Sequence, residues 1–93
     1  MLTYLICYDI EDDRDRARVA KLLERCGQRV QYSVFEVHLA RAEELDRLKD
    51  RLREILADEA ADVRFYRLTA DAVAASHRLD GASIGQRDLV IIV

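Results

Sequence analysis

Acidic side chains crowd the segment that follows the first apolar run of the chain. Asp9 stands directly after that run, and Glu11, Asp12 and Asp13 follow within four residues. Like charges this close repel one another unless a cation lies among them. Carboxylate oxygens are ligands for Mg²⁺, and one or two of them suffice because the ion keeps several waters. Magnesium-dependent chemistry is therefore one use for these acids.

Neighbouring arginines offer a second explanation of the same acids. Asp9 can pair with Arg16 or Arg18, or it can cap the helix that follows it. We expect Asp9 to be half-buried at its strand end, where an unpaired charge is costly. A metal site with one such carboxylate per chain would take its second carboxylate from a two-fold related copy. Spacing alone leaves the arginine and the metal explanations open.

A row of cations occupies one face of the first predicted helix. They recur at intervals of four, three and four residues: Arg14, Arg18, Lys21 and Arg25. Such a row, here called the basic stripe, can follow a phosphate backbone and would make binding salt-dependent. A solvated helix face explains it equally, since Asp15 and Glu24 dilute its charge. Tyr32 and Phe35 could stack on bases or belong to the sheet core.

Composition excludes several other classes of site. The chain has 93 residues and a net charge of −3, which predicts one domain (residues 1–93) that binds nucleic acid only through local basic surfaces. There is no GxGxxG, P-loop, GxSxG or HExxH motif, and His38 and His77 are far apart. Cys7 and Cys26 lack CxxC spacing, which predicts reduced thiols. No signal peptide or membrane span is predicted, so we expect a cytoplasmic protein.

The first half of the chain shows clear hydrophobic periodicity. Residues 2–8 read as a central strand that is buried on both faces. A helix is predicted to begin at Asp12 or Asp13 and to end where Gly27 adopts a positive φ. Residues 29–39 form one long strand, or two short ones with a corner at Ser33.

The second half completes an α+β pattern. A second helix is predicted within residues 43–59, followed by strands at residues 62–68 and 88–93. Residues 69–87 are ambiguous, with a helical turn at 72–75 and a turn at 79–81. The order βαββαβ with an additional C-terminal strand predicts a ferredoxin-like sandwich.

The N-terminal forty residues carry a family resemblance. Residues 8–39, YDIEDDRDRARVAKLLERCGQRVQYSVFEVHL, are similar to the defining stretch of the CRISPR-associated protein 2 family. The marks are a strand ending in Tyr-Asp, a D-D-x-R-x-R helix start, a glycine after the helix and the R-V-Q-Y-S-V-F-E strand. The remaining elements fit the family in a less specific way.

The resemblance implies a homodimer whose open sheet faces meet, with two copies of Asp9 sharing Mg²⁺ or Mn²⁺. It implies a metal-dependent endoribonuclease, with DNA cut by some members. It also implies a central dimer of the spacer-integration complex, which bridges two dimers of the CRISPR integrase, CRISPR-associated protein 1. By motif position Asp9 is the metal ligand, and the other activity-linked residues are Tyr8, Arg16, Arg18, Arg29 and Phe35.

Three functions stay open at this point. The first is a metal-dependent phosphodiesterase that acts on RNA or DNA. The second is a non-catalytic scaffold that holds duplex DNA for the integrase, which the lack of any general base besides Asp9 favours. The third is a toxin-type ribonuclease of related fold outside CRISPR.

Overall fold

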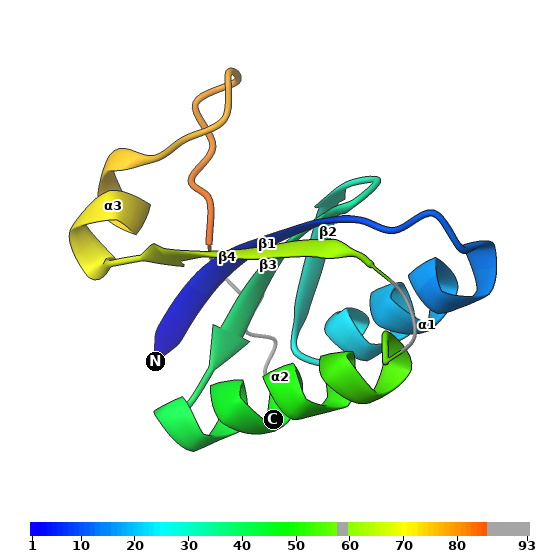
Figure 1. Ribbon diagram of the computed structural model, residues 1–93. Helices are drawn as coiled ribbons and strands as arrows, with labels where there is room; N and C mark the ends of the chain where they lie inside the picture. The colour runs from blue at the N-terminus through cyan, green and yellow to red at the C-terminus, as the bar shows by residue number, and fades with distance from the viewer. Residues whose placement is uncertain (58–59, 86–93) are drawn as a thin grey trace, which may run out of the picture.

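A four-stranded antiparallel sheet carries the helices of the chain, and the computed structural model describes residues 1–57 and 60–85 of it. The elements are β1 (Leu2–Asp9), α1 (Asp13–Glu24), β2 (Gly27–Gln31), β3 (Val34–Leu39), α2 (Ala42–Ile55), β4 (Asp62–Leu68) and α3 (Ala70–Ala75). The strand order is β2-β3-β1-β4. Both α1 and α2 lie on one face of the sheet (Figure 1), so the ferredoxin-like prediction is confirmed.

Alternation along β1 decides which side chains meet the helices. Ile6 and Tyr8 face α1 and α2 and are 0% and 6% exposed. Leu5 and Cys7 point to the other side and are only half-buried. The prediction of a strand buried on both faces is therefore wrong for this chain, because its two long helices cover one face. The side away from α1 and α2 is called the open face below.

The core lies between the sheet and the two long helices. β3 contributes Phe35 and Val37, which are fully buried. α1 contributes Val19 and Leu23 at a spacing of four, as its apolar stripe predicts. The stripe of α2 is likewise buried through Leu45, Leu48 and Leu52. These contacts hold both helices against the sheet and fix the position of the loops at its ends.

Residues 29–39 form a hairpin, which settles the alternative that the sequence left open. β2 and β3 pair antiparallel, and the corner falls at Tyr32 and Ser33, which includes the predicted Ser33. The backbone N–H of Tyr8 donates to the carbonyl of Ser33 at 3.1 Å, so the corner is tied to the end of β1.

Gly27 has a different role from the one predicted. α1 ends at Glu24 with a right-handed cap at Arg25, and the positive-φ glycines in the described ranges are Gly81 and Gly85. Gly27 instead begins β2, where an added Cβ would lie 2.1 Å from the carbonyl oxygen of Glu36. The glycine is required because β2 approaches β3 too closely for a side chain.

The segment after β4 bears out the local predictions. Ala70–Ala75 form α3, and a turn follows at residues 79–81. α3 and the chain after it lie on the open-face side of the sheet (Figure 1). The predicted strand at residues 88–93 falls outside the described residues. Within the ranges 1–57 and 60–85, no helix has the length and apolar character that a membrane crossing requires.

The start of α1 allows a stability test. The side chain of Asp12 accepts a hydrogen bond from the backbone N–H of Asp15 at 2.8 Å, as an N-cap does. Asp12→Ala should therefore cost about 1 kcal/mol of unfolding free energy, which is a fall of about 4–8 °C in melting temperature for a domain of this size. Asp12→Asn keeps an acceptor and should melt close to wild type. Equal melting of the two variants would contradict the cap.

Candidate functional site

Asp9 ends β1 on the open face and is exposed to solvent. Its cross-strand neighbour is Asp62 at the start of β4. Asp62 is occupied by Arg64, whose Nε donates to both carboxylate oxygens at 3.1 Å. The pKa of Arg64 is raised by this contact with Asp62 and, secondarily, by Tyr66. Arg64 thus neutralises Asp62, whereas the charge of Asp9 is not neutralised by Arg64.

The arginine and capping explanations of Asp9 are both wrong in this structure. Arg16 and Arg18 pair with the acids of α1 itself, Asp13 and Asp15, at a spacing of three. The side chain of Asp9 makes no hydrogen bond or ion pair within residues 1–57 and 60–85. The expected half-burial of Asp9 is also wrong, because the end of β1 is exposed on the open face. Water can solvate the carboxylate there, so it needs no charged partner.

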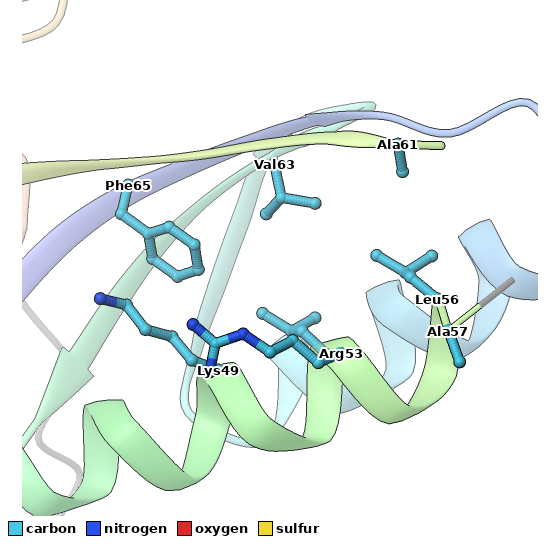
Figure 2. Close-up of a pocket in the computed structure, with 8 residues that line it drawn as sticks. Lys49, Arg53, Leu56, Ala57, Ala61, Val63 and Phe65 are labelled. Carbon is cyan, nitrogen blue, oxygen red and sulfur yellow. The ribbon is translucent and has the colours of Figure 1, made fainter. Parts of the chain in front are cut away.

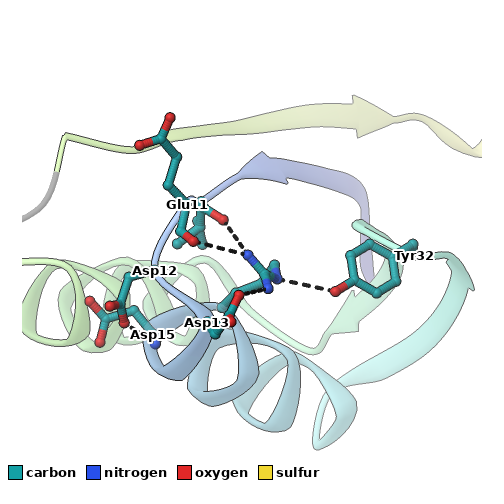
Figure 3. A network of polar contacts seen from close by, with 7 residues as sticks. Glu11, Asp12, Asp13, Asp15 and Tyr32 are labelled. Atoms are coloured by element: carbon teal, nitrogen blue, oxygen red, sulfur yellow. Dashed lines mark hydrogen bonds and ion pairs between the residues drawn. The ribbon is translucent and has the colours of Figure 1, made fainter.

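Arg16 organises the loop between β1 and α1, and Figure 3 shows its contacts. One terminal nitrogen donates to the carbonyl oxygens of Ile10 at 2.8 Å and Glu11 at 3.3 Å. Nε donates to the hydroxyl of Tyr32 at 3.2 Å, and the other terminal nitrogen pairs with Asp13. The pKa of Arg16 is raised, first by Asp13 and then by Tyr32. One guanidinium thereby fixes the loop that follows Asp9 against the hairpin corner.

Arg29 and two aromatic rings extend this cluster along β2 and β3. The Arg29 guanidinium carbon lies 5.7 Å from the ring centre of Tyr32 and 5.2 Å from that of Phe35, within cation–π range. Tyr32 is 69% exposed, whereas Phe35 is fully buried. Of the two alternatives for Phe35, the structure therefore favours the sheet core over base stacking, and its ring supports Arg29 from there.

Tyr8 is the other activity-linked residue that the core encloses. Its ring stacks on Phe35 with centroids 6.3 Å apart. Its hydroxyl is buried and has no hydrogen-bond partner in the described part of the chain. Tyr8 and Phe35 thus position neighbouring groups, and they do not present a surface to a substrate.

The basic stripe is divided by the structure. Arg18, Lys21 and Arg25 line a groove between α1 and α2, whereas Arg14 stands exposed at the first turn of α1, outside that groove. The structure therefore gathers Arg16, Arg29 and Tyr32 beside the loop after Asp9 and places three stripe residues elsewhere. Sequence reasoning missed Asp62 and Arg64, because the register of β4 against β1 has no local signal.

A metal at Asp9 would need oxygen ligands besides this one carboxylate. No three or more His, Cys, Asp or Glu side chains converge on a metal-sized position within the described ranges. Asp62 lies opposite Asp9 but is held by Arg64. Mg²⁺ is usually bound through one or two carboxylates and several waters, so Asp9 fits as a single ligand. Further ligands would come from water, a substrate phosphate or a second copy of the chain.

Comparison with known proteins gives the family. The family model for the CRISPR associated protein Cas2 matches residues 1–75, which span every element from β1 to α3. The chain belongs to the Cas2 family. Among its relatives, the CRISPR-associated endoribonuclease Cas2 3 of Synechocystis sp. is 51% identical over 69 residues, which are 74% of each protein. The CRISPR-associated endoribonuclease Cas2 of Thermus thermophilus is 44% identical over 78 residues, 84% of this chain and 82% of the relative.

Solved Cas2 structures share the fold. A chain of a partial Cas6-RT-Cas1–Cas2 complex superposes with a TM-score of 0.83 at 36% identity, and the match covers all of both chains. Cas2 of Streptococcus pyogenes gives a TM-score of 0.68 at 34% identity, over 83% of this chain and 98% of that one. The resemblance carried by residues 8–39 is confirmed, and the ferredoxin-like sandwich is the fold of other Cas2 chains.

Proposed function

We propose that this Cas2 family member is a metal-dependent endonuclease that acts on RNA, and that it serves in CRISPR spacer acquisition. The observation that carries the nuclease is Asp9, an exposed carboxylate at the end of β1 that has no partner among residues 1–57 and 60–85. The names of the Synechocystis and Thermus relatives, both endoribonucleases, support the same activity. In the cytoplasm, where CRISPR arrays and invading nucleic acids meet, RNA and DNA are both within reach.

A second copy of the chain would complete the site. The open face carries half-buried Leu5, Cys7 and Leu68 around the exposed ring of Tyr66. A domain of this size buries only about 60–65% of the surface that its unfolded chain exposes, so covering this face would stabilise it. A two-fold dimer through the open face would bring a second Asp9 toward the first.

Each side chain of the site has a physical task in this proposal. Mg²⁺ or Mn²⁺, when bound, would supply charge stabilisation at the phosphate and a water of lowered pKa. Asp9 would hold the ion, and Arg16 would keep the following loop in place through its two carbonyl contacts. Arg29 and Tyr32 present a cation and an exposed ring to a single strand. Arg18 lies apart from this cluster, in the groove between α1 and α2, and would bind a phosphate oxygen there.

A DNA-binding scaffold is the second candidate. One solved relative lies in a complex that contains Cas1, and we propose the Cas1 integrase as the partner here. No group of three or more metal-ligating side chains forms in the described ranges, which favours weak catalysis and a structural role. The basic stripe, including Arg14, would then contact duplex DNA. Membership of the Cas2 family disfavours a toxin-type ribonuclease outside CRISPR.

Metal removal tests the nuclease. Wild-type protein is incubated with single-stranded RNA and with duplex DNA in Mg²⁺, in Mn²⁺ and in EDTA. We expect RNA products with either metal and none in EDTA, because in this proposal the metal ion activates the water that attacks the phosphate. Cleavage that persists in EDTA would contradict the metal requirement. No cleavage by a protein that still binds duplex DNA would contradict the nuclease and leave the scaffold.

A further inference from the structure

Arg64 of β4 lies on the open face, near the end of the sheet where Asp9 ends β1. The register of the two strands places Asp62 opposite Asp9. Two residues further along β4, Arg64 lies opposite Cys7. Directly opposite residues of an antiparallel pair share one face of the sheet, and diagonal neighbours are about 7–8 Å apart, within reach of a long side chain. Arg64 is therefore a diagonal neighbour of Asp9 on the same face.

Alternation along β4 gives the direction of Arg64. Its neighbours in the strand, Val63 and Phe65, point toward α2 on the helical side of the sheet (Figure 2). Successive strand residues point to opposite faces, so Arg64 points away from the helices. Its side chain is 63% exposed, so a ligand on the open face can reach it.

Arg64 is the single lysine or arginine that the described strands direct to this face. Residues of β1 to β4 include no lysine, and their other arginines are Arg29 and Arg67. The guanidinium carbon of Arg29 lies 5.2 Å from the ring centre of Phe35. That of Arg67 lies 5.7 Å from the ring centre of Tyr4. Both rings belong to the core or pack against it, so these two arginines lie on the helical side.

An anionic substrate at Asp9 requires a cation nearby. Asp9 and Asp62 are opposite each other, and two carboxylates repel an approaching phosphodiester. Arg64 reduces this repulsion, because Nε contacts both oxygens of Asp62 at 3.1 Å and one terminal nitrogen contacts Oδ2 at 3.0 Å. A guanidinium has five N–H groups in a planar fork, so further donors remain for a phosphate oxygen.

The pair with Asp62 also fixes the direction of the guanidinium. A solvent-exposed ion pair contributes little to the stability of a fold. Two nitrogens of one planar fork on one carboxylate do define an orientation. Asp62 thus holds the charge of Arg64 at the Asp9 end of the open face.

We infer that Arg64 is a further catalytic residue of the Asp9 site, where its guanidinium binds a non-bridging oxygen of the phosphate that is cleaved. Asp62 is its positioning residue. The inference rests on the nuclease proposed above, and it adds a residue from outside the motif of residues 8–39.

The task of Arg64 in this hydrolysis is electrostatic. A water oxygen forms a bond to phosphorus while the bond from phosphorus to one ester oxygen breaks. The water gives up one proton, and the leaving oxygen takes up one. Arg64 transfers no proton, because a guanidinium stays charged. It stabilises the negative charge that grows on the phosphate oxygens in the transition state.

Arg78 provides a matched control for Arg64. It pairs with Asp80 at 2.8 Å, also two residues away in sequence, and its side chain is 66% exposed. It follows α3 and lines a hollow with Glu36 in which Asp9 takes no part. Arg64→Gln and Arg78→Gln therefore each remove one charge from an exposed arginine–aspartate pair, and one of them does so beside Asp9. Thermal melting and light scattering check the fold and the assembly state of both.

Cleavage of labelled single-stranded RNA in Mg²⁺ gives kcat and KM, and fluorescence anisotropy in EDTA gives the affinity for the same RNA without turnover. We expect Arg64→Gln to lower kcat about a hundredfold, as loss of one preorganised donor to a transition state does. Its RNA affinity in EDTA should stay close to wild type, because the lost contact acts in the transition state. Arg78→Gln should match wild type in both. Arg64→Lys keeps the charge but not the planar fork, so its kcat should fall between wild type and Arg64→Gln.

A double-mutant cycle tests the positioning by Asp62. Asp62→Asn should lower kcat in the wild-type background, because Arg64 is then no longer held. In the Arg64→Gln background the same change should have no further effect, since Asp62 acts through Arg64. Equal effects of Asp62→Asn in both backgrounds would overturn the positioning role.

Each contrary outcome overturns a defined part. Wild type that cleaves RNA with neither Mg²⁺ nor Mn²⁺ overturns the nuclease and the role of Arg64 together. Cleavage that Asp9→Asn loses, but that Arg64→Gln and Arg78→Gln both retain, overturns the role of Arg64 alone. An equal loss of RNA affinity and cleavage in Arg64→Gln would make Arg64 a binding residue without a catalytic role. If Arg64→Gln misfolds or changes its assembly state, Arg64→Lys decides, and wild-type kcat for that variant overturns the inference.

Discussion

Asp9→Asn is expected to slow metal-dependent cleavage of RNA on the order of a hundredfold or more. Loss of groups that merely support a metal ligand already costs about 10–100-fold, and Asp9 would be the ligand itself. The amide keeps the size of the side chain and removes its charge. Because Asp9 is exposed and its side chain binds nothing else in the described ranges, the fold should not change. Cleavage is followed with identically purified wild type and variant in Mg²⁺.

Glu11→Gln is the matched control for Asp9→Asn. Glu11 is exposed two residues further on, and its backbone carbonyl, not its carboxylate, accepts from Arg16. This variant loses the same charge and should cleave like wild type. Equal cleavage by Asp9→Asn and wild type would assign the activity to a contaminant or to other residues. A shift of Asp9→Asn to a smaller species in light scattering would show that Asp9 supports assembly instead of catalysis.

Local signals in the sequence predicted most of the fold. Asp12 was one of two predicted caps, and its carboxylate does accept from the first turn of α1. The apolar run at residues 2–8 predicted a strand, and β1 spans Leu2–Asp9. Such features depend on residues a few positions apart, so the chain itself records them. The order of the elements then restricts the topology to a ferredoxin-like sheet.

Contacts between distant elements could not be predicted in the same way. Asp9 lies opposite Asp62 only because of the register of β4 against β1. Arg64 then pairs with Asp62, which reduces the repulsion between the two acids. The burial of Phe35 depends on which face of the sheet the helices cover. Arg51 joins the basic stripe only because α2 packs beside α1. The charges were visible in the sequence, but their partners were not.

Gly27 shows how one glycine admits two explanations. A glycine shortly after a helix usually indicates a left-handed cap, and the sequence does not distinguish this from close strand packing. The structure decides for packing, because the backbone of Glu36 and Val37 occupies the space of a side chain. The hairpin that presents Arg29 and Tyr32 therefore depends on the absence of a single methyl group.

Gly27→Ala should destabilise the protein by at least about 4 kcal/mol, beyond the usual 1–3 kcal/mol of an overpacked site. The new Cβ would lie 2.1 Å from the Glu36 carbonyl oxygen and 2.7 Å from the Val37 Cα. These are backbone atoms of β3, so they can move away only if β2 separates from the sheet. The total free energy of unfolding of a small domain is about 5–15 kcal/mol. We expect Gly27→Ala to lose most of it, as measured by urea unfolding.

Gly81→Ala distinguishes this clash from a general intolerance of alanine at glycine positions. Gly81 has a φ of +89°, and an added Cβ would meet nothing within 4 Å. Its substitution should cost only the left-handed backbone strain, about 1–2 kcal/mol. If Gly27→Ala does not fold well enough for urea titration, the two variants are compared by hydrogen exchange. The rates of the β2 and β3 amides then report how far each variant protects the hairpin. Equal stability of the two variants would mean that β2 can move away from β3 at little cost, and that the hairpin corner is not held by close packing at Gly27.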